Sequence, residues 1–470
     1  MPPKPPSPTS SPSTDRTTSF FTIRRASLAL FSALLFGFWK RNIEPALELG
    51  GIWRTVQPHG TEGCRLVSEL QVCEKIIIHE PTGLVYAACS SIADRKAWLP
   101  ALNYYNASAR SGNDYIALYD PTADSFIKLD VIGLDDPRGL SLHGMDVVPS
   151  SEEPETLWVY LVNHRPPVES AQTSAESGLA HSEDPSIEIF TTRAGSSELR
   201  HVRTVADPVV LHSPNDVAGS PDGKEFWFTN DMKDVDGWKA KLYMILQVAA
   251  TSVGHCHVDR GCKIALDKMP GANGIVRLPS DWAGDKRDAA KDGSGEHKTR
   301  LMLGSATRPE VRILEQQANN TLEVVEVYTH GEIVVSSPFK PSSAYDIQCP
   351  TYGSNLLSLD LPLDNLTVDK RGTVWAAGFP KGADLISKHI PDPLNNPSAS
   401  TAVRVSCGSG KCTVDKPFES DGSNNIASGS TTVAYDAERK RLFLSGVMAP
   451  GLTVCDFNAP PVSPAVQAAS

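Results

Sequence analysis

The sequence lacks the features of several common functional classes. Basic residues are outnumbered, with 44 Lys and Arg against 55 Asp and Glu, and no stripe of positive charge appears. Nucleic-acid binding is therefore not expected, because it needs a basic surface. No Cys/His cluster has the ligand spacing of a zinc site. The nearest case, His255 and His257 around Cys256 with Cys262, is interpreted as a disulfide loop.

Long hydrophobic runs are also scarce. The apolar run near the N-terminus, 26–39, has 14 residues between Arg-Arg and Lys-Arg pairs, whereas a membrane span needs about 20. No small-x-small cleavage site follows it. We predict a disordered tail over 1–18 and a signal anchor or uncleaved leader over 19–41. Such a leader predicts a protein of the secretory pathway, lumenal or extracellular. Residues 26–39 would then attach it to the membrane. A cleaved signal peptide is the alternative.

The chain is rich in turn residues, with 34 Gly and 36 Pro, and an apolar-aromatic strand recurs six times. These strands start at Leu84, Leu157, Phe226, Leu301, Val374 and Leu442, with spacings of 73, 69, 75, 73 and 68 residues. Such a period in a β-rich chain predicts an all-β, six-bladed propeller. We expect it over 60–458, closed by an N-terminal strand and followed by a loose tail, 459–470. Polar inserts at 166–185, 282–298 and 381–427 are expected to be surface loops or lids.

Oxygen-bearing side chains recur at similar distances upstream of these strands. They lie nine to eleven residues before a strand start, once the 17-residue insert 282–298 is set aside: Glu74, Asn215, Asn273, Asp364 and Asn365. Because equivalent positions in successive blades face the central axis, these oxygens should converge. Calcium takes six to eight oxygen ligands in flexible geometry. The sequence therefore predicts a Ca²⁺ site at the hub, although each Asn alone could be a turn residue.

The nine cysteines indicate an oxidising compartment. Cys256 with Cys262, and Cys407 with Cys412, are close enough for local disulfides. Cys64 and Cys455 bracket the six strands, so a bridge between them would fasten the ring. Cys73, Cys89 and Cys349 have no obvious partner. The triplets at Asn106 and Asn319 are compatible with glycosylation.

Several short strings occur in an order that resembles the paraoxonase/arylesterase family. They span roughly residues 64–457 and are Leu142-His143-Gly144-Met145, Val162-Asn163-His164, Ser213-Pro214-Asn215-Asp216, Thr229-Asn230-Asp231, Ala272-Asn273-Gly274, Asp364-Asn365-Leu366, Phe379-Pro380-Lys381-Gly382 and Gly429-Ser430-Thr431. The resemblance implies a six-bladed propeller with calcium in its tunnel and lactonase and arylesterase activity. It also implies that Cys64 and Cys455 form the disulfide that closes the ring in that family. Members of the family likewise retain a hydrophobic leader.

The resemblance further implies roles for single residues. The five hub residues would bind the catalytic calcium, His143 would be the general base, and His164 would be its supporting partner. A second calcium site would use Asp216 and a backbone carbonyl near Met145. In this chain Lys75 stands where the family has a second acid, so a second ion is doubtful. We expect the Lys75 ammonium to replace it and to pair with Asp216 or Asp146.

Two further departures affect the substrate. Phe379 and Met232 stand where members of the family have histidines near the pocket wall, which favours a hydrophobic lactone or ester. Two other functions remain open. One is a related propeller hydrolase of the gluconolactonase or strictosidine-synthase-like type, and the other is a non-enzymatic propeller whose calcium only holds the blades together.

Overall fold

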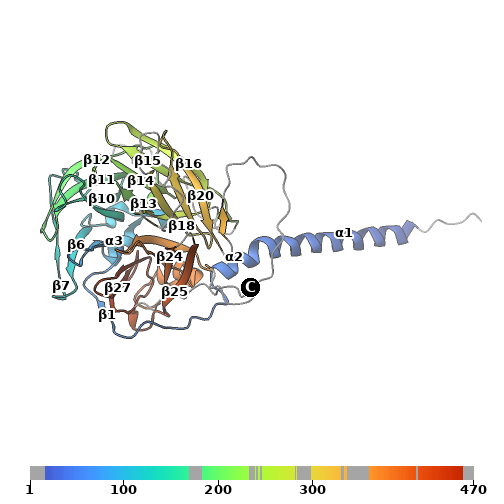
Figure 1. Cartoon of the computed structure of the whole chain (residues 1–470). Helices are drawn as coiled ribbons and strands as arrows, with labels where there is room; N and C mark the ends of the chain where they lie inside the picture. The colour runs from blue at the N-terminus through green and yellow to red at the C-terminus, as the bar shows by residue number, and fades with distance from the viewer. Residues whose placement is uncertain are drawn as a thin grey trace, which may run out of the picture. The chain divides into compact units, whose positions relative to one another are not determined.

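The computed structural model describes residues 16–168, 183–231, 239, 242–243, 246–280, 282, 298–329, 333–335, 359–408 and 411–458, with backbone alone at 16–24, 333–335, 408 and 411. Within these ranges the strands form six sheets of four or five strands and one two-stranded sheet (Figure 1). Neighbouring strands of the six larger sheets are antiparallel, except that β8 pairs parallel with β12. The innermost strands of the sheets contact one another in a closed circle: β2, β9, β13, β17, β22 and β26. The protein is a six-bladed β-propeller, as the strand period predicts.

Each blade is built from strands that follow one another outward from the axis. Blade one consists of β2 (Cys73–His79), β3 (Leu84–Cys89), β6 (Tyr115–Asp120) and β7 (Ser125–Lys128). Blade two consists of β9 (Leu142–Pro149), β10 (Thr156–Arg165), β11 (Asp184–Arg193) and β12 (Glu198–Val205), with β8 (Asp130–Ile132) at its edge. Blade three consists of β13 (Pro214–Gly219), β14 (Glu225–Asn230), β15 (Thr251–His257) and β16 (Gly261–Met269). Blade four consists of β17 (Ala272–Arg277), β18 (Arg300–Ser305), β19 (Val311–Gln316), β20 (Leu322–Tyr328) and β21 (Ile333–Val335). Blade five consists of β22 (Leu363–Val368), β23 (Val374–Gly378), β24 (Ser400–Gly408) and β25 (Lys411–Ser420). Blade six consists of β26 (Thr432–Asp436), β27 (Arg441–Ser445), β28 (Leu452–Asp456) and β1 (Cys64–Val67).

The sixth blade joins the two ends of the ring. Strand β1 supplies its outermost strand and pairs antiparallel with β28, placing Cys64 directly opposite Cys455. These two cysteines form a disulfide across 391 residues of sequence. Closing the ring in this way removes the free edges that an open array of sheets would expose. Both the closing strand and the disulfide agree with the sequence-based expectation.

Three more disulfides connect neighbouring strands. Cys256–Cys262 and Cys407–Cys412 are the expected local bridges. The third, Cys73–Cys89, corrects the expectation that these two cysteines lack a partner. They face each other across β2 and β3, a pairing that only the strand register reveals. Cys349 lies outside the described residues. Four disulfides indicate an oxidising, secretory or extracellular environment.

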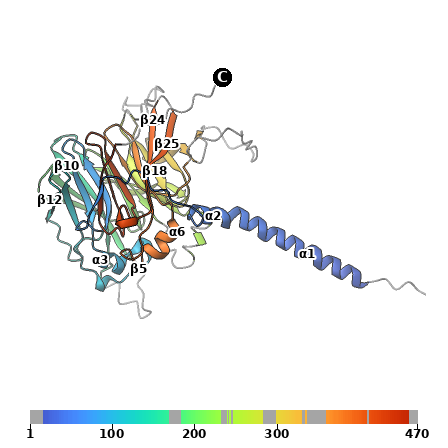
Figure 2. The same cartoon turned by 90° about the horizontal axis from the view of Figure 1, so that it is seen from below.

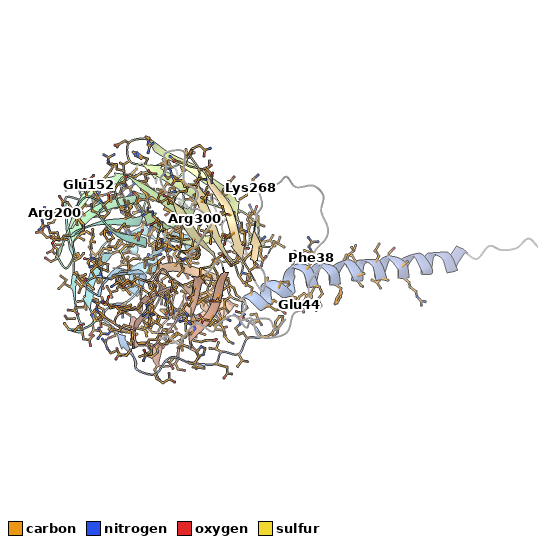
Figure 3. The ribbon with its side chains drawn as sticks, viewed as in Figure 1. Phe38, Glu44, Glu152, Arg200, Lys268 and Arg300 are labelled. Atoms are coloured by element: carbon orange, nitrogen blue, oxygen red, sulfur yellow. A yellow bond between two sulfur atoms is a disulfide. The ribbon has the colours of Figure 1, made fainter. Side chains whose placement is uncertain are left out.

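The hydrophobic core is divided into slabs between neighbouring blades. One slab, for example, packs Tyr86 and Ile116 of blade one against Met145, Val159 and Phe190 of blade two. Equivalent slabs fill the other five interfaces. The second strand of each blade is covered on both faces, which explains why these strands read as continuous apolar runs. Charged residues such as Glu152, Arg200 and Lys268 lie at the outer edge of the ring (Figure 3).

Short helical insertions gather at one end of the propeller. Helix α3 (Ile92–Ala97) and the hairpin β4 (Trp98–Leu99) and β5 (Tyr104–Tyr105) lie near α6 (Gly382–Asp384), as Figure 2 shows. An apolar cluster of Leu99, Leu385, Ile390 and Met448 connects these insertions. The expectation of a loop over 381–427 is wrong for much of its length, because this segment also contributes β24 and β25.

The N-terminal residues form a separate unit. It comprises α1 (Arg16–Phe38), the π-helical turn Trp39–Ile43 and the start of α2 (Glu44–Leu49). Among the described residues, no helix is both long enough and apolar enough to cross a membrane. The signal anchor or leader therefore stays a prediction. Of the predicted disordered tail 1–18, residues 16–18 belong to α1, and 1–15 lie outside the described residues, as does the predicted tail 459–470. Asn106 and Asn319 are exposed.

Candidate metal and catalytic site at the hub

The sequence-predicted site residues lie in β-bulges near the starts of five inner strands. In β2 a single extra residue, Glu74, separates the Cys73–Cys89 and Lys75–Ala88 pairs. In each of the next four blades the inner strand also carries a bulge: between two successive residue pairs it advances three residues, while its partner strand advances two. Those bulges contain His143, Asn215, Asn273, and Asp364 with Asn365. A bulge changes the direction of nearby side chains, so the repeated bulge directs side chains from five blades toward the hub.

Two of these bulges depend on glycine. A Cβ on Gly144 would lie 2.5 Å from the Asn215 carbonyl oxygen, and one on Gly274 would lie 2.4 Å from the Asp364 carbonyl oxygen. No side chain fits at such distances, so glycine allows the inner strands of adjacent blades to approach closely. The two glycines therefore set the spacing of blades two and three, and of blades four and five, at the site.

Glu74 lies at the junction of blades one, five and six. The Asn365 amide donates to Glu74 Oε1 at 3.1 Å, and the Thr431 hydroxyl donates to Glu74 Oε2 at 3.0 Å. The same Asn365 amide group also donates to the backbone carbonyls of Glu74 and Thr431, each at 3.1 Å. This carboxylate is thereby fixed by residues almost 300 and more than 350 positions away in the sequence.

Asn215 connects the general-base candidate to the hub. Its Nδ2 donates to His143 Nε2 at 3.3 Å and to Asp231 Oδ2 at 3.4 Å. His143 Nε2 also lies 3.8 Å from Glu74 Oε1. The structure therefore brings Glu74, His143 and Asn215 together, while Asn365 joins them through Glu74.

The donor atoms that a cation would need lack partners. Among the described side chains, five hub oxygens are buried without a hydrogen bond. Four belong to proposed ligands, Asn215 Oδ1, Asn273 Oδ1, Asp364 Oδ1 and Asn365 Oδ1, and the fifth is Asp216 Oδ1. Leaving a buried acceptor unsatisfied is costly, so each such atom needs an explanation. Four of them on successive inner strands fit a hard, oxygen-seeking cation. No group of three or more His, Cys, Asp or Glu in the described chain suits a metal, so amide oxygens would have to complete the ligand set.

Electrostatics at the hub also favour a cation. Burial raises the pKa of Glu74 to about 7, with Arg95 opposing the shift, and raises that of Asp231 to about 6. The pKa of Asp364 is raised well above its usual value, first by burial and then by repulsion from neighbouring carboxylates, led by Glu74. A bound dication would offset this repulsion and stabilise the ionised forms.

A second acidic group at the hub already has a cation. Lys75 Nζ lies 2.5 Å from Asp216 Oδ2 and donates to the Leu366 carbonyl at 3.0 Å, and both side chains are fully buried. Asp216 Oδ2 accepts in addition from the Ile275 backbone N–H at 3.0 Å. The ion pair thus connects blades one, three, four and five.

The alternative partner of Lys75 is engaged elsewhere. Asp146 accepts backbone N–H bonds from Val147 at 2.9 Å and from Gly219 at 2.8 Å. Of the two expected pairings, Lys75 with Asp216 is therefore the one formed. Met145, expected near a second ion, is a buried core residue of β9 paired with Leu161.

His164 packs against His143. The two imidazole rings are 5.1 Å apart and nearly perpendicular, at 89°. His164 Nδ1 forms a short hydrogen bond with the Glu183 carboxylate. Trp98 of the insertion donates to the His164 backbone carbonyl at 2.6 Å. Burial lowers the pKa of His143 well below its usual value, and electrostatic interactions with His164, Arg95 and Lys75 add to the shift.

A cavity of about 260 Å³ opens at the other end of the tunnel. All six inner strands line it, three to five residues beyond the bulges, through residues that include Ile77, Val147, Val276 and Val368. Its polar members, Glu80 and Arg277 among them, are separate from the bulge cluster. The chemistry-bearing groups therefore gather at the starts of the inner strands and this cavity at their ends.

Similarity of this chain to known proteins is found among solved structures. No protein-family model matches the chain, and neither does any curated protein. Similar solved structures include a gluconolactonase from Xanthomonas campestris (11% identity, 86% of this chain and 98% of that chain covered, TM-score 0.39). Another is a proposed gluconolactonase (12%, 83% and 90%, TM-score 0.40). A third is a proposed oxidoreductase of the glucose dehydrogenase type from Thermus thermophilus (12%, 83% and 98%, TM-score 0.38). At these identities and scores the likenesses carry no argument about activity.

Several residues of the site were not predicted from the sequence. Asp231 follows the second strand of blade three, Thr431 precedes the sixth inner strand, and Glu183 precedes β11. None occupies the bulge position that the other site residues share. Phe379, expected near the pocket wall, packs against the apolar cluster of the insertions. Met232 lies outside the described residues.

Proposed function

We propose that this protein is a calcium-dependent hydrolase of lactones or aryl esters. The observation that carries the proposal is the set of four orphaned, buried oxygens beside a neutral, buried imidazole. Glu74, Asn215, Asn273, Asp364 and Asn365 would hold the ion, with two carboxylates balancing its charge. When bound, Ca²⁺ would supply Lewis-acid polarisation of the substrate carbonyl. The resemblance to the paraoxonase/arylesterase family agrees with this assignment.

His143 is suited to act as the general base. Because Asn215 Nδ2 can only donate, His143 Nε2 must carry the lone pair in their 3.3 Å contact. A lowered pKa keeps this imidazole neutral at physiological pH, which is the state that accepts a proton. The proton of an attacking water would pass to His143 Nε2, and the imidazolium would be stabilised by Glu74 Oε1 at 3.8 Å.

The second acidic group supports a single ion per chain. Lys75 already neutralises Asp216 at 2.5 Å, so a second cation there would have to displace a buried ammonium. We propose that the ammonium stands in for a second metal. Elemental analysis of the dialysed protein should give one calcium per chain. Two tightly held ions would contradict this part of the proposal.

The substrate is proposed to be apolar. Phe379 and the cluster formed by Leu99, Leu385 and Met448 belong to the insertions at one end of the propeller. Trp98 connects that insertion to the backbone of His164, so the apolar insertion is adjacent to the proposed base. Hydrophobic lactones and aryl esters should therefore be hydrolysed faster than polar sugar lactones.

A substrate panel with and without calcium tests the proposal. Long-chain lactones, phenyl acetate and gluconolactone should be assayed with the wild type, His143→Gln and the control His255→Gln. His255 is also buried but pairs with Glu225, away from the hub. We expect a chelator to abolish turnover and His143→Gln to lower kcat by about 100-fold or more, with the control unaffected. Faster hydrolysis of gluconolactone would favour the gluconolactonase-like alternative. A calcium-dependent rise in Tm without turnover of any substrate would reject the enzyme and leave a calcium-stabilised binding propeller.

A further inference from the structure

We infer that Glu183 is a positioning residue that fixes the proton of His164 on Nδ1. Its carboxylate holds His164 in the one tautomer that complements His143. The inference deepens the proposed function and rests on it for its kinetic consequence. The arrangement of the three side chains can nevertheless be tested without any assay of activity.

The contact between Glu183 and His164 is buried and specific. The exposed fractions of the two side chains are 8% and 1%, and the bond is between Glu183 Oε2 and His164 Nδ1. The backbone of His164 is fixed independently, because its N–H donates to Ser141 O at 2.8 Å and its carbonyl accepts from Trp98. The carboxylate therefore determines how the ring is turned and which nitrogen is protonated.

The hydrogen bonds specify where each proton lies. A carboxylate accepts, so in the neutral ring His164 Nδ1 carries the hydrogen and Nε2 the lone pair. The opposite assignment holds for His143, whose Nε2 accepts from Asn215 and whose Nδ1 therefore carries the hydrogen. His164 offers an acceptor and His143 offers a donor.

The two remaining nitrogens form no hydrogen bond in this structure, either with each other or with another described group. Within the described chain, His143 Nδ1 and His164 Nε2 are both buried and without a hydrogen bond, while their rings lie 5.1 Å apart, edge to face. His143 Nδ1 carries a hydrogen to donate, and His164 Nε2 has a lone pair to accept it. The order of groups is then carboxylate, His164, His143 and hub, with the lone pair of His143 Nε2 at its end.

This order gives a balanced proton path for hydrolysis. As the oxygen of water bonds to the substrate carbonyl carbon, its proton moves to His143 Nε2. The Nδ1 proton of His143 can then pass to His164 Nε2, so the positive charge rests on His164 beside the Glu183 carboxylate. When the carbon–oxygen bond to the leaving group breaks, the same protons return and the leaving oxygen is protonated. No oxidant, reductant or further reactant is required.

A second buried glutamate, on the strand that directly follows Glu183, provides a matched control. Glu188 of β11 accepts from Asn163 Nδ2 at 3.2 Å and from the Ser186 hydroxyl at 2.6 Å, and it also contacts His201 at 3.2 Å. It contacts a histidine, as Glu183 does, but that histidine lies on β12, away from the hub. Loss of its charge should affect stability rather than turnover.

The structural part is tested by NMR on protein labelled with ¹⁵N-histidine, where the ring shifts distinguish the two tautomers. His164 is assigned by the loss of its signals in His164→Gln. We expect the Nδ1–H tautomer in the wild type and a mixture with Nε2–H in Glu183→Ala, with Glu188→Gln unchanged. An Nε2–H tautomer in the wild type, or no change in Glu183→Ala, would overturn the inference, whether or not the protein proves to be a hydrolase.

The kinetic part uses calcium-saturated protein and a substrate found active in the panel. Glu183→Gln should lower kcat on the order of 10- to 100-fold while KM and calcium affinity stay within twofold. Added formate should partly restore kcat in Glu183→Ala, an effect that repair of a merely structural defect would not produce. A kcat of Glu183→Gln within twofold of wild type, or an equal loss in Glu188→Gln, would overturn the role. Failure of wild type to turn over any substrate would instead reject the proposed function and leave the NMR result standing.

Discussion

Two adjacent residues of β2, Glu74 and Lys75, begin two clusters at the hub that differ in their electrostatics. The Lys75 cluster contains its own cation, 2.5 Å from Asp216 Oδ2, and has one oxygen without a hydrogen bond, Asp216 Oδ1. The Glu74 cluster combines buried acids of raised pKa with four oxygens that have no partner. A buried acid with a resident ammonium joins blades together, whereas acids surrounded by orphaned oxygens are suited to receive a ligand. Changing each cluster separately should show whether they have these different roles.

The largest effect is expected from Asp364→Asn in the Glu74 cluster. It removes one of only two proposed carboxylate ligands, so calcium binding should be lost and kcat should fall by about 100-fold or more. Isothermal titration calorimetry with calcium and the lactone assay measure the two effects. Asp415→Asn, on the outer strand of the same blade and paired with Arg404, is the control. Unchanged calcium affinity in Asp364→Asn would contradict the ligand assignment.

The next largest effect is expected from Lys75→Met in the second cluster. It leaves Asp216 buried and unpaired, so the free energy of unfolding should fall by about 3–5 kcal/mol. Urea unfolding monitored by tryptophan fluorescence measures this change. The double variant Lys75→Met/Asp216→Leu should recover much of the loss, because no charge is then left buried. Lys370→Met, which breaks the exposed pair with Glu438, should change stability little.

A loss in Lys75→Met no greater than in the exposed-pair control would show that Asp216 does not depend on its ammonium. The distinction between the two clusters would then fail. A calcium requirement for folding of Lys75→Met, absent from the wild type, would sharpen it instead, because it would show an ion taking the place of the side chain.

A smaller effect is expected from pH. Burial raises the pKa of Glu74 to about 7 and of Asp231 to about 6, so between about pH 4 and pH 7 the folded state binds more protons than the unfolded state. Stability of the metal-free protein should therefore fall as pH rises through this window. Glu80, with a pKa of about 7, contributes a slope of the same sign that calcium does not remove.

Thermal unfolding with a chelator and with calcium, between about pH 5 and pH 8, separates these contributions. We expect the Tm of the metal-free protein to drop by several degrees, and the gap between the two curves to widen as pH rises, since the ion favours the ionised carboxylates. A gap that is constant across the range would show that the Glu74 cluster does not bind the ion.

The smallest effect is expected from Gly144→Ala between the clusters. The added methyl group would meet the Asn215 carbonyl oxygen and the Asp216 Cα, each at 2.5 Å, and should cost about 1–3 kcal/mol. Chemical denaturation measures the cost. Gly304→Ala, where the nearest atom lies 3.3 Å away, should be milder. Equal costs would indicate that the close approach of β9 and β13 is not needed.

The sequence predicts the fold well because each blade repeats the same buried second strand. The predicted starts at Leu84 and Val374 coincide with β3 and β23, and Leu157 lies one residue inside β10. The donor side chains follow from the same repeat, since equivalent positions face one axis. Glu74 and Asn215 both lie beside His143, a residue that the resemblance implies and the repeat does not.

Other features depend on register or on distant segments. The bulges that aim the donors add one residue to a strand without altering its hydrophobic pattern, and the Cys73–Cys89 bridge needs the same register. Asp231 and Glu183 reach the site from the second and third strands of their blades, where no repeated offset marks them. The 381–427 segment is polar enough to resemble a loop, yet residues 400–408 and 411–420 within it form the paired strands β24 and β25.

The contact between Glu74 and Thr431 has a consequence for biosynthesis. These residues come from the first and last blades, so their hydrogen bond forms only after the sixth blade has folded against the first. A nascent chain that still lacks 432–456 has no sixth inner strand to hold Thr431 against Glu74, so this side of the hub is incomplete. Calcium capture would then occur as a late step of maturation and would distinguish completed molecules from truncated ones.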